Sequence, residues 1–412
     1  MKRLIKNILL VFFLLIWFNM GYANQSKALP QYTLEVDIMP EQQMMHVDLN
    51  IQIDSGYLQH GNLHLMHNRA AEHTLIEAKP RAEVKVNQLD EARKSIALHF
   101  SDLNKEEVSV SMAYKLKIPK DHQVNRITET WIELNIDSFW FPVINSFPLF
   151  NYNMTLDIDS AYTVMTGDIK GSQNDLVIIK NRLPRIDISF SAAKEFFTEE
   201  GDYVKVYATT SNLPLDSVRI ISDQALSFLK EYLDEPEDFD HKRKVIISPR
   251  KEVGYSRKNY VVLSDIKNKS ELELSGFLAH EFAHYWFSEA LLSSKHHWLT
   301  ESFAEYISMI FVREQYGQQA FEDDIERKQQ RIEGDKKTLA EYDSRPSYLA
   351  MYYKGPLILH QFEQYLGKQN FQTLINDFVD QSIATNEGLF GLIEKRFGND
   401  AVNKLKELRA TI

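Results

Sequence analysis

Residues 278–287 read LAHEFAHYWF, and they place two histidines on either side of a glutamate in the spacing H-E-x-x-H. Ser270 and Glu273, just upstream, form the pattern of a capping box, so we expect a helix to begin at Ser270. Residues four apart lie on one face of a helix, and His280 and His284 can therefore share one metal ion. Glu281 lies about 100° round the same helix from His280, close enough to reach a water on that ion without being a ligand.

A third ligand is available in the next stretch with helical spacing, HHWLTESFAEYISMIFVREQYG, residues 296–317, in which we expect the helix to start near Thr300. Glu301 lies in its first turn, and two imidazoles with one carboxylate leave a fourth position open, as in catalytic zinc sites. Glu305 follows one turn later. We predict that it accepts the second N–H of a ligand histidine, with a solvated surface residue as the alternative. His296 and His297 remain rival ligands, although a pair of loop histidines is more often polar surface.

The motifs around these residues resemble the gluzincin metallopeptidases of the aminopeptidase N type. HEFAHYWFSEALL, residues 280–292, is similar to the family's H-E-x-x-H-x-W-F-G-N-x-x helix, and WLTESFAEY, residues 298–306, is similar to its W-L-N-E-G-F-A segment. The resemblance implies that His280, His284 and Glu301 bind one zinc ion per chain. It also implies that Glu281 is the general base.

A third motif lies downstream. MYYKGPLILHQFEQYLG, residues 351–367, is similar to the family's Y-E-K-G segment. The resemblance implies that the Tyr352 hydroxyl stabilises the oxyanion, and Tyr353 is the rival if the register shifts by one residue.

The chain departs from the family where the substrate's free amino terminus is bound. The family's G-x-M-E-N strand supplies a glutamate for that ammonium, whereas GYSRKNYVVLSD, which begins at Gly254, has Arg257 and Lys258 nearby. Two cations would repel an ammonium. Glu133, in the first half of the chain, is the alternative anchor. The strand NYVVLS, residues 259–264, is expected to be an edge strand that could hold an extended peptide by its main chain. The family's large C-terminal helical domain is also expected to be absent, so the resemblance is to a shortened form.

The fold class follows from a change of periodicity along the chain. Residues 45–54, 108–118 and 151–159 alternate apolar and polar side chains, as half-buried strands do, and from about residue 194 the pattern becomes mainly helical. We predict an N-terminal antiparallel β-sandwich or saddle over residues 24–193. A thermolysin-like, mainly helical α/β zinc peptidase domain is expected over residues 194–412. Gly317, Gly367 and Gly398 lie where its helices are expected to end.

The first 23 residues have the layout of a secretory signal peptide: a basic start, the apolar run ILLVFFLLIWF and small residues before a cleavage site. We expect export to a bacterial periplasm, with a membrane anchor formed by an uncleaved segment as the alternative. No stable membrane span is expected in the mature chain. The net charge of −11 argues against a nucleic-acid partner, and the absence of cysteine excludes a disulfide framework.

The combined interpretation is an exported zinc metallopeptidase, aminopeptidase-like, with altered recognition of the substrate's amino terminus and a peptide as its partner. One alternative is an endopeptidase that acts on blocked or internal bonds. The other is a non-catalytic, zinc-retaining, peptide-binding module of the envelope, which would have no need of Glu281 or Tyr352. The sequence does not indicate an oligomeric state.

Overall fold

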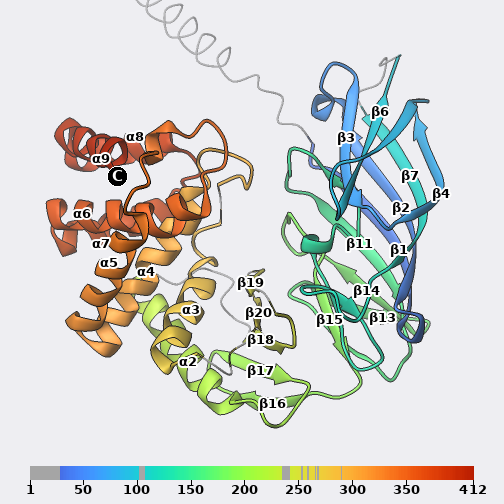
Figure 1. Ribbon diagram of the computed structural model, residues 1–412, viewed down its shortest axis with the longest axis horizontal. Coiled ribbons are helices and arrows are strands. Elements are labelled where there is room, and N and C mark those ends of the chain that lie inside the picture. Colours follow the sequence, from blue (N-terminus) through green and yellow to red (C-terminus); the bar gives the residue numbers. More distant parts are fainter. Residues whose placement is uncertain are drawn as a thin grey trace, which may run out of the picture.

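The computed structural model describes residues 28–412, except 102–106, 234–241, 252–253, 258, 265, 267–268 and 289. The predicted signal peptide, residues 1–23, lies outside the described residues. Figure 1 shows a β-rich N-terminal part on one side, a helical C-terminal part on the other, and a small sheet between them. The predicted two-part fold class is confirmed.

The largest sheet of the N-terminal part has seven strands in the order β13-β14-β11-β1-β2-β7-β4. Its strands are β1 (Gln31–Met39), β2 (Met44–Asp54), β4 (Glu72–Lys79), β7 (Glu107–Lys117), β11 (Asn151–Asp157), β13 (Ile169–Gln173) and β14 (Leu176–Lys180). The alternation in β2 and β7 puts every second side chain in the core, as the sequence predicted.

Two four-stranded sheets complete this part, in the orders β10-β3-β6-β5 and β12-β15-β9-β8. Their strands are β3 (Asn62–Asn68), β5 (Glu83–Gln88), β6 (Arg93–His99), β8 (Arg126–Ile127), β9 (Ile132–Leu134), β10 (Val143–Ile144), β12 (Thr163–Met165) and β15 (Phe190–Ala193). Apolar side chains from all three sheets join in one continuous core.

The prediction of a purely antiparallel first part is wrong in one place, because β1 and β11 pair in parallel. Parallel strands need a long crossover connection, and here β11 follows β1 only after the chain has passed through both other sheets.

The second part begins with a five-stranded sheet in the order β16-β17-β18-β20-β19. Its strands are β16 (Phe197–Glu200), β17 (Val204–Ala208), β18 (Arg243–Ser248), β19 (Tyr255–Ser256) and β20 (Tyr260–Ser264). β17, β18 and β20 run parallel, and β16 and β19 are antiparallel edge strands. The predicted domain division after residue 193 falls in the connection between β15 and β16.

Helices make up the rest of the chain: α2 (Leu215–Tyr232), α3 (Glu271–Ala283), α4 (Trp298–Tyr316), α5 (Gln318–Ile332), α6 (Gly355–Leu366), α7 (Lys368–Asp380), α8 (Asn386–Phe397) and α9 (Asn399–Thr411). Gly317, Gly367 and Gly398 end helices with φ of 90°, 82° and 85°, as predicted, because glycine alone adopts that conformation without strain. None of the helices in the described part of the chain is both long and apolar enough to span a bilayer.

A buried charge network joins the two parts. Arg250, which follows β18, donates from Nη1 to Glu133 Oε1 at 3.0 Å and from Nη2 to Asp137 Oδ2 at 2.8 Å. Arg257, which follows β19, donates from Nε to Asp187 Oδ2 at 2.8 Å. Glu133 and Asp187 are almost fully buried, so each depends on its arginine for charge compensation.

Arg250→Met is expected to destabilise the protein by about 3–5 kcal/mol, because it leaves the Glu133 carboxylate buried without a cation. Thermal unfolding followed by circular dichroism measures the loss. The control is Lys242→Met, which breaks the exposed ion pair between Lys242 Nζ and Glu200 Oε1 (2.8 Å) and should change the melting temperature little. Equal losses in the two variants would contradict a stabilising role for the interdomain network.

Candidate metal centre

The helix α3 holds the two histidines on one face. Ser270 caps it as predicted: its side chain accepts from the Glu273 amide, and the Glu273 carboxylate accepts from the Ser270 amide. The helix ends at Ala283, so His284 is the residue that follows the last helical one. Its φ of −60° and ψ of −10° remain near helical values, and its imidazole stays one turn beyond that of His280.

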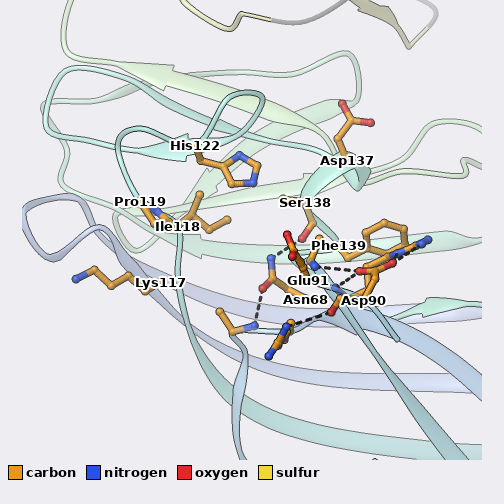
Figure 2. A pocket seen from close by; sticks show the side chains of 14 residues that line it. Asn68, Asp90, Glu91, Lys117, Ile118, Pro119, His122, Asp137, Ser138 and Phe139 are labelled. Atoms are coloured by element: carbon orange, nitrogen blue, oxygen red, sulfur yellow. Dashed lines mark hydrogen bonds and ion pairs between the residues drawn. The ribbon is translucent and has the colours of Figure 1, made fainter. Parts of the chain in front are cut away.

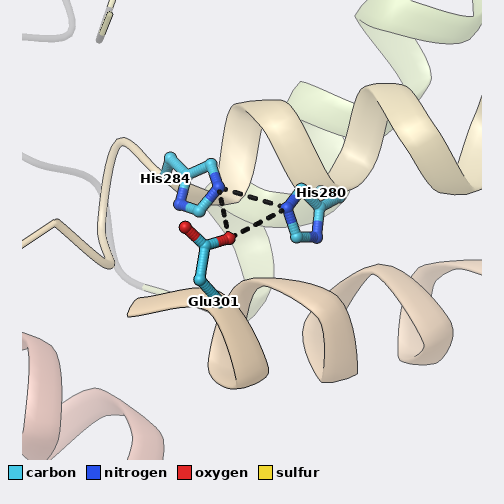
Figure 3. Close-up of side chains that lie close together, drawn as sticks. All are labelled: His280, His284 and Glu301. Atoms are coloured by element: carbon cyan, nitrogen blue, oxygen red, sulfur yellow. Dashed lines mark hydrogen bonds and ion pairs between the residues drawn. The ribbon is translucent and has the colours of Figure 1, made fainter. Parts of the chain in front are cut away.

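The third candidate ligand comes from the neighbouring helix. Glu301 lies in the first turn of α4, which packs along α3, and Figure 3 shows its carboxylate directed at both imidazoles. Both helices contribute largely buried faces at this point, and Glu301 is only 8% exposed. The structure thus brings together the three residues predicted from the sequence.

The three donor atoms converge on one point. His280 Nε2 and His284 Nε2 are 3.1 Å apart, and Glu301 Oε2 lies 3.7 Å from the first and 3.5 Å from the second. Two ligands about 2.0–2.1 Å from a tetrahedral zinc ion are about 3.3 Å apart. In the described part of the chain, this is the one cluster of such side chains able to hold a metal ion.

The outer ring nitrogens show why a cation belongs between the imidazoles. His284 Nδ1 lies 3.3 Å from the Phe287 carbonyl, which can only accept, so Nδ1 carries the proton. His280 Nδ1 lies 2.9 Å from Glu305 Oε2, which favours the same tautomer. The two Nε2 atoms then face each other at 3.1 Å, an arrangement that a proton or a metal cation between them stabilises. The donor set and its spacing fit one zinc ion, as predicted.

Two further predicted residues border this point. Glu281 is buried next to His280, and Tyr352 donates its hydroxyl to Glu301 Oε2 at 2.6 Å. The Tyr352 ring also stacks on His280, with centroids 5.5 Å apart. Tyr353, the rival, instead lies with its ring 5.2 Å from the Lys328 ammonium.

Tyr352 is presented by an irregular turn. Residues Ala350–Lys354 form a short π-helix, labelled η6, immediately before α6. Ser302 donates from Oγ to the Met351 carbonyl at 2.7 Å, and a Cβ on Gly355 would collide with the Ser302 side chain. The close approach of α4 and α6 at Gly355 therefore sets where the turn, and with it Tyr352, can lie.

The electrostatics of the centre favour positive charge between the ligands. Burial alone would lower the pKa of His280, but the neighbouring Glu301 and Glu305 carboxylates raise that pKa to about 10. Burial lowers the pKa of His284 to about 4. The carboxylates that favour a proton on His280 would also favour a metal ion in its place, and His284 is favoured in the neutral form that a ligand needs.

The two acidic side chains beside the ligands differ in the same field. Burial raises the pKa of Glu281 to about 7, within the range of an efficient general base. Burial alone would also raise the pKa of Glu305, yet the Lys328 ammonium and the hydrogen bond to His280 hold that pKa well below its usual value. The field therefore favours the charged form of Glu305 and makes Glu281 the more readily protonated of the two.

The two histidines before α4 were expected on the surface, but the structure places His297 in the interior. His297 is buried, with Nε2 3.1 Å from Glu301 Oε1, the oxygen other than the one nearest His280 and His284. His296 Nδ1 accepts from the Asn386 amide at 3.0 Å, outside the cluster. Neither belongs to the ligand group, but His297 orients a ligand, because α4 starts two residues earlier than predicted and draws His297 into the core.

A cleft of about 1160 Å³ leads to the centre. His280, Glu281 and Tyr352 line it, together with Gly254 and Phe277. Another cavity, of about 970 Å³, lies in the N-terminal part and is shown in Figure 2. None of the described residues that line this second cavity is a predicted site residue, so the first cleft is the candidate substrate path.

The prediction that Arg257 and Lys258 repel the amino terminus of a substrate is not supported for Arg257. Arg257 is not a free cation, since it is paired with Asp187, and Lys258 lies outside the described residues. Glu133, the alternative anchor, is paired with Arg250 and also accepts from Ser248 Oγ and from Trp131 Nε1. The described acidic groups here are therefore already occupied by partners within the protein.

Comparisons with known proteins identify the C-terminal part. Residues 255–395 match the peptidase family M1 domain. A search of curated proteins finds no match.

Solved structures match over most of the chain. An M1 zinc metallopeptidase from Deinococcus radiodurans, solved as a point mutant, has a TM-score of 0.69 at 12% identity, with 93% of this chain and 94% of that one covered. The same mutant has been solved bound to a Tyr-Ser-Ala substrate, with a TM-score of 0.66 at 12% identity, covering 94% of this chain and 95% of that one.

Native leukotriene A4 hydrolase from Saccharomyces cerevisiae has a TM-score of 0.72 at 11% identity, and the match covers 94% of this chain and 68% of that one. At such identities the likeness concerns the fold alone. Together with the family match it confirms the resemblance seen in the motifs: residues 255–395 are a peptidase family M1 domain, in a chain with the fold of M1 zinc metallopeptidases.

Proposed function

We propose that this chain is an exported, zinc-dependent peptidase, aminopeptidase-like, with altered recognition of the substrate's amino terminus. The observation that carries the proposal is the convergence of His280, His284 and Glu301 beside a cleft that His280, Glu281 and Tyr352 line. A structure of a D. radiodurans M1 enzyme with a bound tripeptide supports a peptide as the substrate. Export rests on the signal-like segment at residues 1–23.

Each side chain has a distinct part in hydrolysis. When bound, the zinc ion supplies a Lewis acid. Glu281, with its pKa raised by burial, takes a proton from the attacking water and later passes it to the leaving nitrogen. Burial also raises the pKa of Tyr352, so its hydroxyl keeps its proton and can donate to the oxyanion. Glu305 fixes the tautomer and the orientation of His280.

The metal content tests the ligand assignment. The mature protein should hold about one zinc ion after dialysis, and His284→Ala should lose most of it because one of three protein ligands is removed. Elemental analysis measures both proteins, and chelator treatment should lower the melting temperature of the wild type but not that of His284→Ala. His296→Ala, outside the cluster, is the control. Full zinc content in His284→Ala would place the ion elsewhere.

Glu281→Gln tests catalysis separately from metal binding. The amide keeps the shape of the side chain and removes the base, so the variant should retain zinc and lose at least about a hundredfold in kcat. Peptide hydrolysis and zinc content are measured on the same preparation. Hydrolysis at the wild-type rate would contradict the assignment. A wild type that binds zinc and cleaves no peptide would favour the non-catalytic peptide-binding module.

An endopeptidase, or a peptidase for blocked substrates, is a second candidate. The observation in its favour is that Glu133, Asp137 and Asp187 are each paired with an arginine. An extended peptide could instead bind by its main chain. The edge strand available for this is β19, not the NYVVLS strand we had expected, because a hairpin folds β19 back against β20 and covers that edge.

N-acetylated peptides should be cleaved within about tenfold of the rate of their free-amine partners, a difference of about 1.4 kcal/mol. The reason is that no buried ammonium–carboxylate pair is lost on acetylation, a loss that would cost several kcal/mol. Matched peptide pairs, compared by kcat/KM, provide the measurement. Cleavage of the free-amine peptides alone would restore a strict aminopeptidase.

A further inference from the structure

Lys328 is a buried lysine for which the proposed reaction gives no role. It lies on α5, a helix whose other fully buried residue is Phe321, and its side chain is only 2% exposed. An ammonium is rarely buried unless it is paired, since its desolvation is costly. Its position therefore calls for a specific set of partners.

The ammonium has partners on two sides. Its Nζ contacts Glu305 Oε1 directly and donates to the Tyr352 carbonyl at 3.1 Å, while Asp324 Oδ2, on its own helix, lies 3.9 Å away. The Tyr353 ring covers it, with the centroid 5.2 Å from Nζ. Both charged and neutral contacts are thus made with groups on α4 and on the π-helical turn.

Each of the two main partners leads to the metal centre by a separate route. The other oxygen of Glu305 lies 2.9 Å from His280 Nδ1. The hydroxyl of Tyr352 donates to Glu301 Oε2 at 2.6 Å. One ammonium therefore contacts both the carboxylate that orients a ligand histidine and the backbone of the turn that presents the tyrosine.

We propose that Lys328 is a positioning residue for the metal centre, acting on His280 through the Glu305 carboxylate and on Tyr352 through its backbone carbonyl. The ammonium holds Glu305 in the rotamer that meets His280 Nδ1. It also satisfies a carbonyl in a π-helical turn, where the backbone hydrogen bonds are irregular. This inference rests on the proposed function for the role of Tyr352, but not for metal binding.

Lys328→Met tests the proposal, because methionine fills similar space without the charge. Zinc affinity, measured by competition with a chromophoric chelator, should fall about 10- to 100-fold, as it does when a group that orients a metal ligand is lost. At saturating zinc, kcat should fall while KM stays near the wild-type value, since Tyr352 acts on the transition state.

Lys354 provides a matched control. It is also 2% exposed and belongs to the same turn, but its Nζ donates to the Asp335 and Lys337 carbonyls, both at 2.9 Å, and not to a residue of the centre. Lys354→Met should lower stability and leave zinc affinity unchanged. A merely structural role for Lys328 would give the same result in both variants.

A double variant covers the case in which Lys328→Met does not fold. In the double variant Glu305→Gln with Lys328→Met, position 305 carries no charge. Removing the lysine therefore leaves no buried carboxylate without a partner. Since Lys328 acts on zinc affinity through Glu305, this pair should bind zinc as tightly as Glu305→Gln alone. A further loss in the pair would overturn the route through Glu305.

Zinc affinity equal to wild type in Lys328→Met, with unchanged kcat, would overturn the whole proposal. The affinity measurement uses zinc alone and no peptide. A wild type that binds zinc but cleaves nothing would therefore remove the proposed function, while the ratio of zinc affinities would still decide the role of Lys328.

Discussion

The centre depends on the packing of α3 against α4, which places the Glu301 carboxylate opposite two imidazole nitrogens 3.1 Å apart. Two nitrogen lone pairs at that distance would repel each other, so the pair requires a proton or a metal cation between the two imidazoles. The surrounding groups serve this pair of helices: Glu305 and the Phe287 carbonyl hold the outer ring nitrogens, and His297 holds the second oxygen of Glu301. Metal binding and helix packing are thus parts of one energetic unit.

The sequence predicted those parts of the molecule that depend on local chemistry. The Ser270 capping box, the alternation in β2 and the glycine helix ends are all decided within a few residues, and each lies where it was predicted. The proximity of His280 and His284 follows from helical periodicity alone. The approach of Glu301 was found because it lies in the first turn of the next helix.

The features that the sequence missed depend on long-range packing. Lys328 lies in a polar helix, where a lysine normally faces solvent, and nothing in its neighbours signals that α5 turns it toward Glu305. Likewise, Arg257 and Glu133 each pair with a residue from the other part of the chain. The local sequence does not show these partners, so both side chains were predicted to be available to a substrate. The parallel pairing of β1 with β11 is also a property of topology.

The contact between Gly355 and Ser302 links two requirements that are separate in most helical proteins. Gly355 allows α6 to approach α4 closely, and Ser302 at the same contact bonds to the turn that carries Tyr352. Any side chain larger than hydrogen would separate the helices and shift the tyrosine together. Both the packing of the core and the placement of the Tyr352 hydroxyl therefore require glycine at position 355. We expect few substitutions to be tolerated there.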